Sequence, residues 1–250
     1  MSIDTLATFL LLPYIRNNYA LLAKEARAKD YSYEQFLEQL LQGETDQRRN
    51  NSLYKRIRKA RFPYQMELGD FKTEHLSTEL KRKIKQLENL EFIRNRENII
   101  LVGNPGTGKT ALSIALGMKA CREYRNVLFI SVPLLMMEIS EAMSNSQIIQ
   151  YKKRFEKYDL VILDELGYCS FSKDAGELLF NLLSSRNEVG SIIITSNLSI
   201  DKWDEVFKDK ILTGAIVDRL TNKAHLIDMS GESYRIRQTR MWMEENNGKE

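Results

Sequence analysis

The octapeptide from Gly103 to Thr110 reads GNPGTGKT and fits the pattern G-x-x-x-x-G-K-[ST] in full. The apolar run from Asn98 to Val102 predicts a strand directly before it, and residues Thr110 to Tyr124 predict a helix directly after it. In that context the backbone N–H groups point at phosphate oxygens, and the helix N-terminus adds partial positive charge. We therefore predict a phosphate-binding loop. The alternative is a tight glycine turn with a solvated lysine.

The ligand predicted for this loop is ATP, with Mg²⁺ as its cation. Lys109 is expected to reach the β and γ phosphates, and the hydroxyl of Thr110 is expected to ligate Mg²⁺. The candidate ATP-binding residues are Gly103, Asn104, Pro105, Gly106, Thr107, Gly108, Lys109, Thr110 and Ala111.

A second candidate element is the run Leu160 to Leu163, which predicts a buried strand and ends in Asp164 and Glu165. Open α/β sheets bind their ligands at the carboxyl ends of the strands. Asp164 is therefore a candidate to hold Mg²⁺, through water, and Glu165 is a candidate general base for an attacking water. The alternative is a solvated strand end.

Two further polar residues lie where they could act on the same phosphate. Asn197 follows the predicted strand Ser191 to Thr195 and is a candidate to orient the water, against the alternative of an asparagine that ends a strand in a turn. Arg219 follows a predicted helix from Ile211 to Val217 and is a candidate to stabilise transition-state charge on a neighbouring copy. Its alternative is a surface ion pair with Asp218. The candidate catalytic residues are Glu165, Lys109, Asn197 and Arg219.

The predicted strands are continuous Val, Ile and Leu runs, which is typical of strands covered on both faces. Such strands alternate with helices from Thr78 onward, so residues 78–250 are predicted to form an α/β domain with a parallel sheet. The strands are expected at Asn98 to Val102, Val127 to Val132, Leu160 to Leu163 and Ser191 to Thr195, with a short apolar segment at Leu226 and a leading helix from Thr78 to Arg94.

Residues 1–64 predict a small all-helical domain, and residues 65–77, which are polar and aromatic without a clear period, predict a linker. Asp4 is expected to cap a short helix that ends before Pro13, and a second helix is expected from Tyr14 to Lys29. Ser32 and Gln35 form a capping box for a third helix, which Gly43 is expected to close. A fourth helix is expected over residues 48–61.

That fourth segment, RRNNSLYKRIRKAR, carries seven basic residues and no acidic one. Basic helices bind nucleic acid by neutralising phosphates, and no base-reading motif is visible, so sequence-tolerant binding to duplex DNA is the prediction. Two alternatives stay open: a solvated charged helix face, and a docking surface for a protein partner, which is compatible with DNA binding.

Composition excludes several other classes. The chain of 250 residues has 43% hydrophobic and 28% charged residues, which excludes disordered and fibrous proteins. Two cysteines, Cys121 and Cys169, cannot build a disulfide scaffold, and with His75 and His225 alone a multi-ligand zinc site is excluded. The apolar run from Leu6 to Pro13 is too short to span a bilayer. We therefore expect a cytoplasmic protein with no membrane partner.

The four elements GNPGTGKT, LVILDE, ITSN and VDRL occur in an order that resembles the AAA+ ATPases of the DnaC/DnaA-type initiator clade, from about Phe71 to the C-terminus. Within that clade the chain is similar to the IstB family, the transposition helper ATPases of IS21-family insertion sequences. The segments LLPYIRNNYALLAKEA, YSYEQFLEQLL and KRIRKARFPYQMELGDF support this similarity. The resemblance covers nearly the whole chain.

The resemblance implies a five-stranded parallel sheet of order 5-1-4-3-2 and ATP bound at subunit interfaces. It puts Asn197 in the sensor-1 place and Arg219 in the arginine-finger place. It also implies an extra helix, here Pro133 to Tyr151, that helps to line a DNA-binding surface and is followed by three basic residues. The candidate DNA-binding residues are Arg48, Arg49, Lys55, Arg56, Arg58, Lys59, Lys152, Lys153 and Arg154.

The family implies an ATPase that assembles on duplex DNA as a ring or spiral, remodels the DNA, and recruits and stimulates a partner transposase, IstA. Two rivals stay open: a DnaC or DnaI type helicase loader, and an ATP-gated scaffold with incidental hydrolysis. The absence of Cys and His before His75 argues against a loader with a zinc-binding N-terminal domain, and Glu165 argues against the scaffold. Residues 231–250 are too few for the helical lid that many AAA+ proteins place after the core, so the sequence leaves open whether a sensor-2 arginine exists. Arg235 and Arg237 are left open between nucleotide and DNA.

Overall fold

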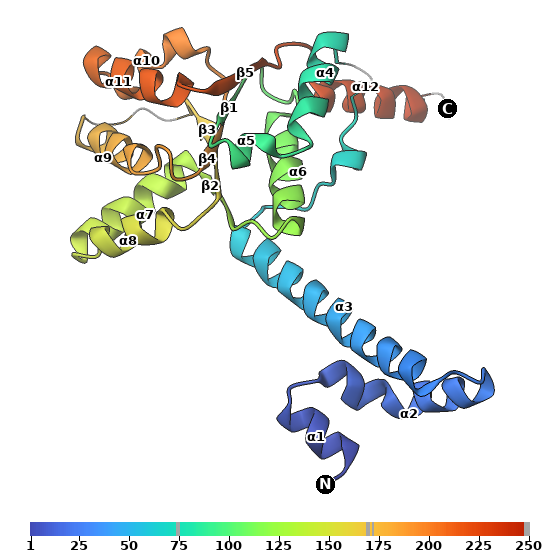
Figure 1. Ribbon diagram of the computed structural model, residues 1–250. Coiled ribbons are helices and arrows are strands. Elements are labelled where there is room, and N and C mark those ends of the chain that lie inside the picture. Colours follow the sequence, from blue (N-terminus) through green and yellow to red (C-terminus); the bar gives the residue numbers. More distant parts are fainter. Residues whose placement is uncertain (74–75, 169–170, 172, 248–250) are drawn as a thin grey trace. The chain divides into compact units, whose positions relative to one another are not determined.

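The computed structural model describes residues 1–73, 76–168, 171 and 173–247, so that His75 and Cys169 lie outside the described residues (Figure 1). The chain divides into two compact units, Met1–Lys55 and Arg56–Glu250. The predicted N-terminal domain extends further, to residue 64. The boundary lies earlier because Arg56 already belongs to the second unit, where its Nε donates a hydrogen bond of 2.8 Å to the carbonyl of Cys121.

The first unit is helical, with α1 at Ile3–Phe9, α2 at Pro13–Ala28 and the start of α3, which runs over Tyr33–Ala60 and crosses into the second unit. Ser2, and not Asp4 as predicted, caps α1, since its Oγ accepts from the N–H of Thr5 at 3.2 Å. The predicted capping box is present: Gln35 N–H donates to Ser32 Oγ at 3.2 Å, and Ser32 N–H donates to Gln35 Oε1 at 2.9 Å.

The prediction that Gly43 closes a helix is wrong, because α3 continues through it as one helix of 28 residues. The reason for the glycine is tertiary. A Cβ built at Gly43 would lie 2.0 Å from Cε1 of Tyr14, so the ring of Tyr14 in α2 occupies the space that any side chain would need. Gly43 therefore serves the close approach of two helices and does not interrupt either one.

The second unit contains a five-stranded parallel sheet of order β2-β3-β4-β1-β5, which confirms the expected order 5-1-4-3-2. The strands are β1 Asn98–Val102, β2 Val127–Ser131, β3 Leu160–Leu166, β4 Ser191–Ser196 and β5 Ala224–Asp228. The central residues of β1 are fully buried, because helices cover both faces of the sheet. Figure 1 shows α7, α8, α9 and α11 on one side of the sheet and α4 and α6 on the other.

The helices of this unit are α4 Thr78–Leu87, α5 Glu91–Arg94, α6 Lys109–Arg122, α7 Val132–Ser144, α8 Ile148–Phe155, α9 Lys173–Ser184, α10 Asp204–Phe207, α11 Lys210–Thr221 and α12 Tyr234–Asn247, with single 3₁₀ turns η1 Leu68–Asp70 and η2 Ile200–Lys202. No helix in the described part of the chain has both the length and the apolar character needed to span a bilayer.

Three predicted helices differ from those observed. The helix predicted from Thr78 to Arg94 is two, because Leu90 adopts a left-handed conformation with φ of 56°. The helix predicted from Pro133 to Tyr151 is also two, α7 and α8, separated at residues 145–147. Helix α11 continues past Val217 to Thr221, so Arg219 lies inside this helix and does not follow it.

Candidate nucleotide site

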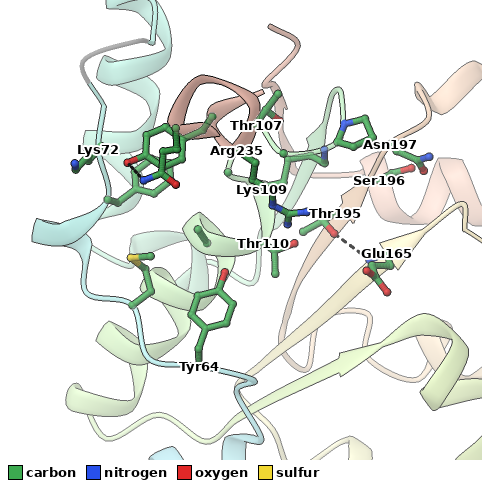
Figure 2. Close-up of a pocket in the computed structure, with 18 of the residues that line it drawn as sticks. Tyr64, Lys72, Thr107, Lys109, Thr110, Glu165, Thr195, Ser196, Asn197 and Arg235 are labelled. Carbon is green, nitrogen blue, oxygen red and sulfur yellow. Dashed lines mark hydrogen bonds between the residues drawn. The ribbon is translucent and has the colours of Figure 1, made fainter. Parts of the chain in front are cut away.

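A cavity of about 550 Å³ lies at the carboxyl ends of β1, β3 and β4, where open α/β sheets bind ligands (Figure 2). We call it the nucleotide pocket. Its wall combines the glycine-rich loop, the strand ends, the segment before α4 and the first turns of α12. The lining residues are Tyr64, Met66, Asp70, Phe71, Lys72, 105–111, Glu165, Tyr168, Thr195, Ser196, Asn197, Tyr234, Arg235 and Gln238.

Lys109 is curled back into the glycine-rich loop. Its Nζ donates to the carbonyls of Gly103 at 2.6 Å and Asn104 at 2.7 Å, and the residue is only 9% exposed. Burial lowers the pKa of Lys109; the charge of Asp164 raises it, and that of Arg235 lowers it further. The loop thus presents one ammonium group, at the start of α6, whose desolvation an anion would offset.

The segment that leads into α12 contacts the glycine-rich loop through two hydrogen bonds. The N–H of Tyr234 donates to the carbonyl of Gly106 at 2.9 Å, and Asn104 Nδ2 donates to the carbonyl of Gly231 at 3.2 Å. A Cβ at Gly103 would lie 2.5 Å from the carbonyl carbon of Met229, so only glycine fits there. The loop is therefore held between α6 and the segment that enters α12.

Asp164 and two hydroxyl groups form a compact oxygen cluster at the pocket floor. Asp164 Oδ1 accepts from Thr110 Oγ1 at 2.9 Å and from Thr195 Oγ1 at 2.6 Å. The residue is 6% exposed. A buried carboxylate beside hydroxyl oxygens is the donor set that Mg²⁺ accepts, with water completing the shell. Thr110 and Asp164, the two predicted metal-site residues, are thus brought together, and their chemistry fits the ion.

Glu165 differs from its neighbour Asp164 because the strand is irregular at this point. The register of β3 against β4 shifts between Leu163 and Leu166, and Glu165 adopts φ of 67°. Its N–H donates to Thr195 Oγ1 at 3.0 Å, and its side chain is exposed to the pocket. Figure 2 shows the Glu165 carboxylate beside Thr195. A solvent-accessible carboxylate lies next to a buried one, which suits a base beside a metal ligand.

Asn197 also lines the nucleotide pocket, at the end of β4. Its Oδ1 is buried and has no hydrogen-bond partner among the described residues. Buried polar atoms are rarely left without a partner, so the unpaired oxygen is compatible with a role in orienting a bound group or water.

Arg235, which the sequence left undecided, lies in the nucleotide pocket. It comes from the first turn of α12, and Figure 2 shows its side chain reaching toward Lys109 and the end of β4. Helix α12, which carries Arg235, was not predicted from the sequence. Ser233 could have indicated the start of this helix, because serine is a common helix-capping residue. Its Oγ accepts from the N–H of Ile236 at 3.4 Å.

The segment predicted as a linker is also part of the pocket. Met66, Asp70, Phe71 and Lys72 line it, preceded by Tyr64. Burial raises the pKa of Tyr64, the charge of Asp164 raises it further, and that of Arg235 opposes both. Only the aromatic residues within an otherwise polar stretch could have suggested this role.

Arg219 does not line the nucleotide pocket of its own chain. Its guanidinium carbon lies 5.3 Å from the ring centroid of Phe180, and no ion pair with Asp218 occurs among the described residues. The side chain lines a second cavity, at the opposite edge of the sheet.

Some of the basic residues predicted to bind DNA contact other residues of the chain. Arg48 donates to Glu44 Oε1 at 3.1 Å and to the carbonyl of Leu11 at 2.7 Å, and Arg56 stacks 4.5 Å from the ring centroid of Tyr124. Arg154 stacks similarly, 5.0 Å from Tyr151. Of the nine candidates all except Arg56 are exposed to solvent, namely Arg48, Arg49, Lys55, Arg58, Lys59, Lys152, Lys153 and Arg154.

Comparison with known proteins gives a family and a fold. The family model described as "IstB-like ATP binding protein" matches residues 5–241. A protein of insertion sequence IS21 from Pseudomonas aeruginosa, named for ATP binding, is 32% identical over 238 residues, which covers 95% of this chain and 90% of that protein. The corresponding protein of IS5376 from Geobacillus stearothermophilus is 31% identical and covers 92% of each chain.

Among solved structures, AMPPCP-bound DnaA from Aquifex aeolicus aligns with a TM-score of 0.57 at 20% identity, over 75% of this chain and 57% of that one. DnaI aligns with a TM-score of 0.55 at 20% identity, over 70% of this chain and 93% of that one. These likenesses establish an AAA+ fold. The match over residues 5–241, at about a third identity to relatives of similar length, shows that this chain belongs to the family of IstB-like ATP binding proteins.

Proposed function

We propose that this protein binds ATP with Mg²⁺ and hydrolyses it to ADP and phosphate. The observation that carries the proposal is the Thr110–Asp164–Thr195 oxygen cluster, with the solvent-accessible Glu165 carboxylate beside it. A pocket that only held a nucleotide would need the cation ligands but would have no use for a carboxylate in reach of water.

The geometry of the nucleotide pocket supports the following roles. The backbone N–H groups of the loop and Lys109 bind the phosphates, and Thr110 and Asp164 would hold Mg²⁺, which supplies charge neutralisation when bound. The Glu165 carboxylate takes a proton from a water as the water oxygen attacks the γ phosphorus. The bond from the γ phosphorus to the bridging oxygen breaks, and ADP leaves. Asn197 Oδ1 accepts a hydrogen bond from the water's other O–H group, which stays intact.

Arg219 acts in this proposal from a neighbouring copy. Its own nucleotide pocket does not contain it, and a charge at the transferring phosphate is worth on the order of 10³ to 10⁵ in rate where it operates. A homo-oligomer in which each pocket meets the Arg219 face of the next chain follows from this assignment.

The biological setting we propose is DNA transposition. The relatives that match over nine-tenths of both chains belong to insertion sequences, whereas the likeness to DnaI extends to the fold alone. The exposed basic residues of α3 and α8 suit sequence-tolerant binding of duplex DNA. We propose that the protein assembles on DNA with ATP, as a ring or spiral, remodels the DNA, and recruits and stimulates an IstA-like transposase.

The decisive experiment measures ATP turnover, with and without duplex DNA, for Glu165→Gln. Removal of a general base should lower turnover by roughly 10²- to 10⁴-fold while nucleotide binding is kept. Glu177→Gln, an exposed carboxylate of α9 outside the pocket, is the matched control and should retain full activity. Undiminished turnover in Glu165→Gln would contradict the proposal and favour an ATP-gated scaffold.

A further inference from the structure

A second cavity, of about 310 Å³, lies at the amino ends of β1 and β4, the opposite edge of the sheet from the nucleotide pocket. We call it the amino-edge pocket. Five cationic residues from three stretches of the chain, 94–96, 186 and 219–223, line it together with a single acidic residue, Glu188. The cationic residues are Arg94 at the end of α5, Arg96 before β1, Arg186 after α9, Arg219 in α11 and Lys223 before β5.

Three of these cations are not neutralised by the protein. The side chains of Arg94, Arg96 and Lys223 are exposed, and they form no ion pair or hydrogen bond with the part of the chain that the structure describes. Like charges that converge on one concavity repel one another and raise the local positive potential. An anion placed among them removes that repulsion.

Arg186 supplies the buried side of the amino-edge pocket. It is 1% exposed, and its Nη1 and Nη2 donate to the carbonyls of Phe155 at 2.7 Å and Tyr158 at 2.8 Å. Its Nε is buried and has no acceptor among the described residues. Burial lowers the pKa of Arg186 to about 10, against the opposing charges of Asp159 and Glu156, so the guanidinium is charged at neutral pH and its Nε–H is unused.

We propose that the amino-edge pocket binds a phosphate group. Guanidinium groups match phosphate oxygens with paired N–H donors, and lysine adds a point charge. The pocket offers three arginines beside the buried one, a lysine, and the exposed side chains of Asn187 and Asn222 as neutral donors. A single carboxylate in the lining leaves a clear excess of positive charge for an anion to neutralise.

The phosphate group could come from two sources: a nucleotide held by a second copy of this chain, and the backbone of DNA. The presence of Arg219 in the pocket links the first source to the proposed function, and to that extent the inference rests on it. Phosphate binding itself requires no hydrolysis, so it can be tested separately.

The test uses the full chain carrying Lys109→Ala, which disables the phosphate-binding loop, and inorganic pyrophosphate as the probe in calorimetry at low salt. Pyrophosphate should still bind. Adding Arg96→Gln and Lys223→Gln should weaken binding by about tenfold or more. The control adds Arg82→Gln and Lys85→Gln, which remove the same charge from exposed positions of α4, and should change affinity little.

Loss of pyrophosphate binding in Lys109→Ala alone, or equal weakening by the pocket pair and the α4 pair, would overturn the proposal. Circular dichroism checks that the variant carrying the pocket pair, Arg96→Gln and Lys223→Gln, is folded. The single change Arg94→Gln should also weaken pyrophosphate binding. Because the readout is binding, a failure of Glu165→Gln to reduce turnover would leave this result intact.

Two further measurements, made in the chain with Lys109 intact, identify the source of the phosphate: ATP turnover without DNA, and the salt dependence of the affinity for duplex DNA. If it is a second copy's nucleotide, the pocket pair lowers ATP turnover without DNA, and the deficit persists at every salt concentration that permits turnover. If the source is DNA, the double substitution leaves ATP turnover without DNA unchanged. The slope of log affinity for duplex DNA against log salt concentration then becomes shallower by about one to two units, because each lost phosphate contact reduces the slope by roughly 0.9.

Discussion

The hydroxyl of Thr195 donates a 2.6 Å hydrogen bond to Asp164 Oδ1 and accepts a 3.0 Å hydrogen bond from the N–H of Glu165. One side chain on β4 thereby fixes two adjacent acidic residues of β3. These two hydrogen bonds matter because the register of β3 against β4 shifts between Leu163 and Leu166, so regular strand pairing does not hold Asp164 and Glu165 in place.

Thr195→Val should therefore lower ATP turnover. The substitution keeps the side-chain shape, removes the donor to Asp164 and leaves the N–H of Glu165 unpaired, at a cost of about 1–3 kcal/mol. We expect turnover to fall by roughly tenfold or more. Thr195→Ser keeps the hydroxyl and should retain most of the activity. An equal loss in both variants would show that the methyl group, and not the hydroxyl, is what matters.

Arg235→Gln should weaken ATP binding. The guanidinium lies in the nucleotide pocket close enough to lower the pKa of Lys109, so it adds to the positive potential that phosphates meet. A charged hydrogen bond is worth about 1.5–3 kcal/mol, which corresponds to a loss of affinity on the order of tenfold to a hundredfold. Equilibrium titration with a fluorescent ATP analogue measures it.

The matched control for that variant is Arg237→Gln. Arg237 lies two positions along α12 but pairs with Glu232 at 3.4 Å and does not line the nucleotide pocket. Its replacement should leave ATP affinity unchanged. If both variants lose affinity alike, the effect belongs to α12 as a whole.

The nucleotide pocket could be predicted from sequence to the extent that it is built from strand ends. The loop motif, Asp164, Glu165 and Asn197 follow strands whose continuous apolar runs mark them, and parallel strands bring their carboxyl ends to one edge. The sheet order followed from resemblance, because no pairing rule in the sequence distinguishes one order of buried strands from another.

The rest of the pocket depends on contacts between distant segments. Tyr64 and Phe71 enter it because the chain between α3 and α4 crosses α6, and Arg235 enters it because Tyr234 binds the carbonyl of Gly106. Neither contact has a periodicity or motif. Gly43 shows the converse error. Its local sequence predicts a helix end, but the glycine is required by the ring of Tyr14, which is distant in the sequence.

Gly43→Ala should destabilise the N-terminal unit. In an exposed helix this change stabilises by up to about 1 kcal/mol. Here the new Cβ would overlap the ring of Tyr14, and overpacking of this kind costs about 1–3 kcal/mol, so the sign reverses. Urea unfolding followed by circular dichroism measures the change. The double variant Gly43→Ala with Tyr14→Ala should be less unstable than the sum of the two single changes, and simple additivity would refute the contact.

ATP binding should become coupled to proton uptake at alkaline pH. Burial lowers the pKa of Lys109 in the free protein below its ordinary value, and a bound triphosphate would raise it again by favouring the charged form. ATP affinity should therefore fall as pH rises through the lowered pKa. Calorimetry in buffers of different ionisation enthalpy measures the protons taken up. Lys109→Arg stays charged throughout, so whatever affinity it retains should lack this pH dependence.

Arg219 acting across an interface predicts complementation between two inactive chains. Lys109→Ala should lose ATP binding, and Arg219→Ala should keep binding but lose most turnover. In an equal mixture about a quarter of head-to-tail interfaces join an intact phosphate loop to an intact Arg219, so part of the activity should return. Lys109→Ala mixed with the double variant Lys109→Ala, Arg219→Ala contains no such interface and is the control. Absence of recovery at every mixing ratio would place the whole reaction within one chain, without Arg219.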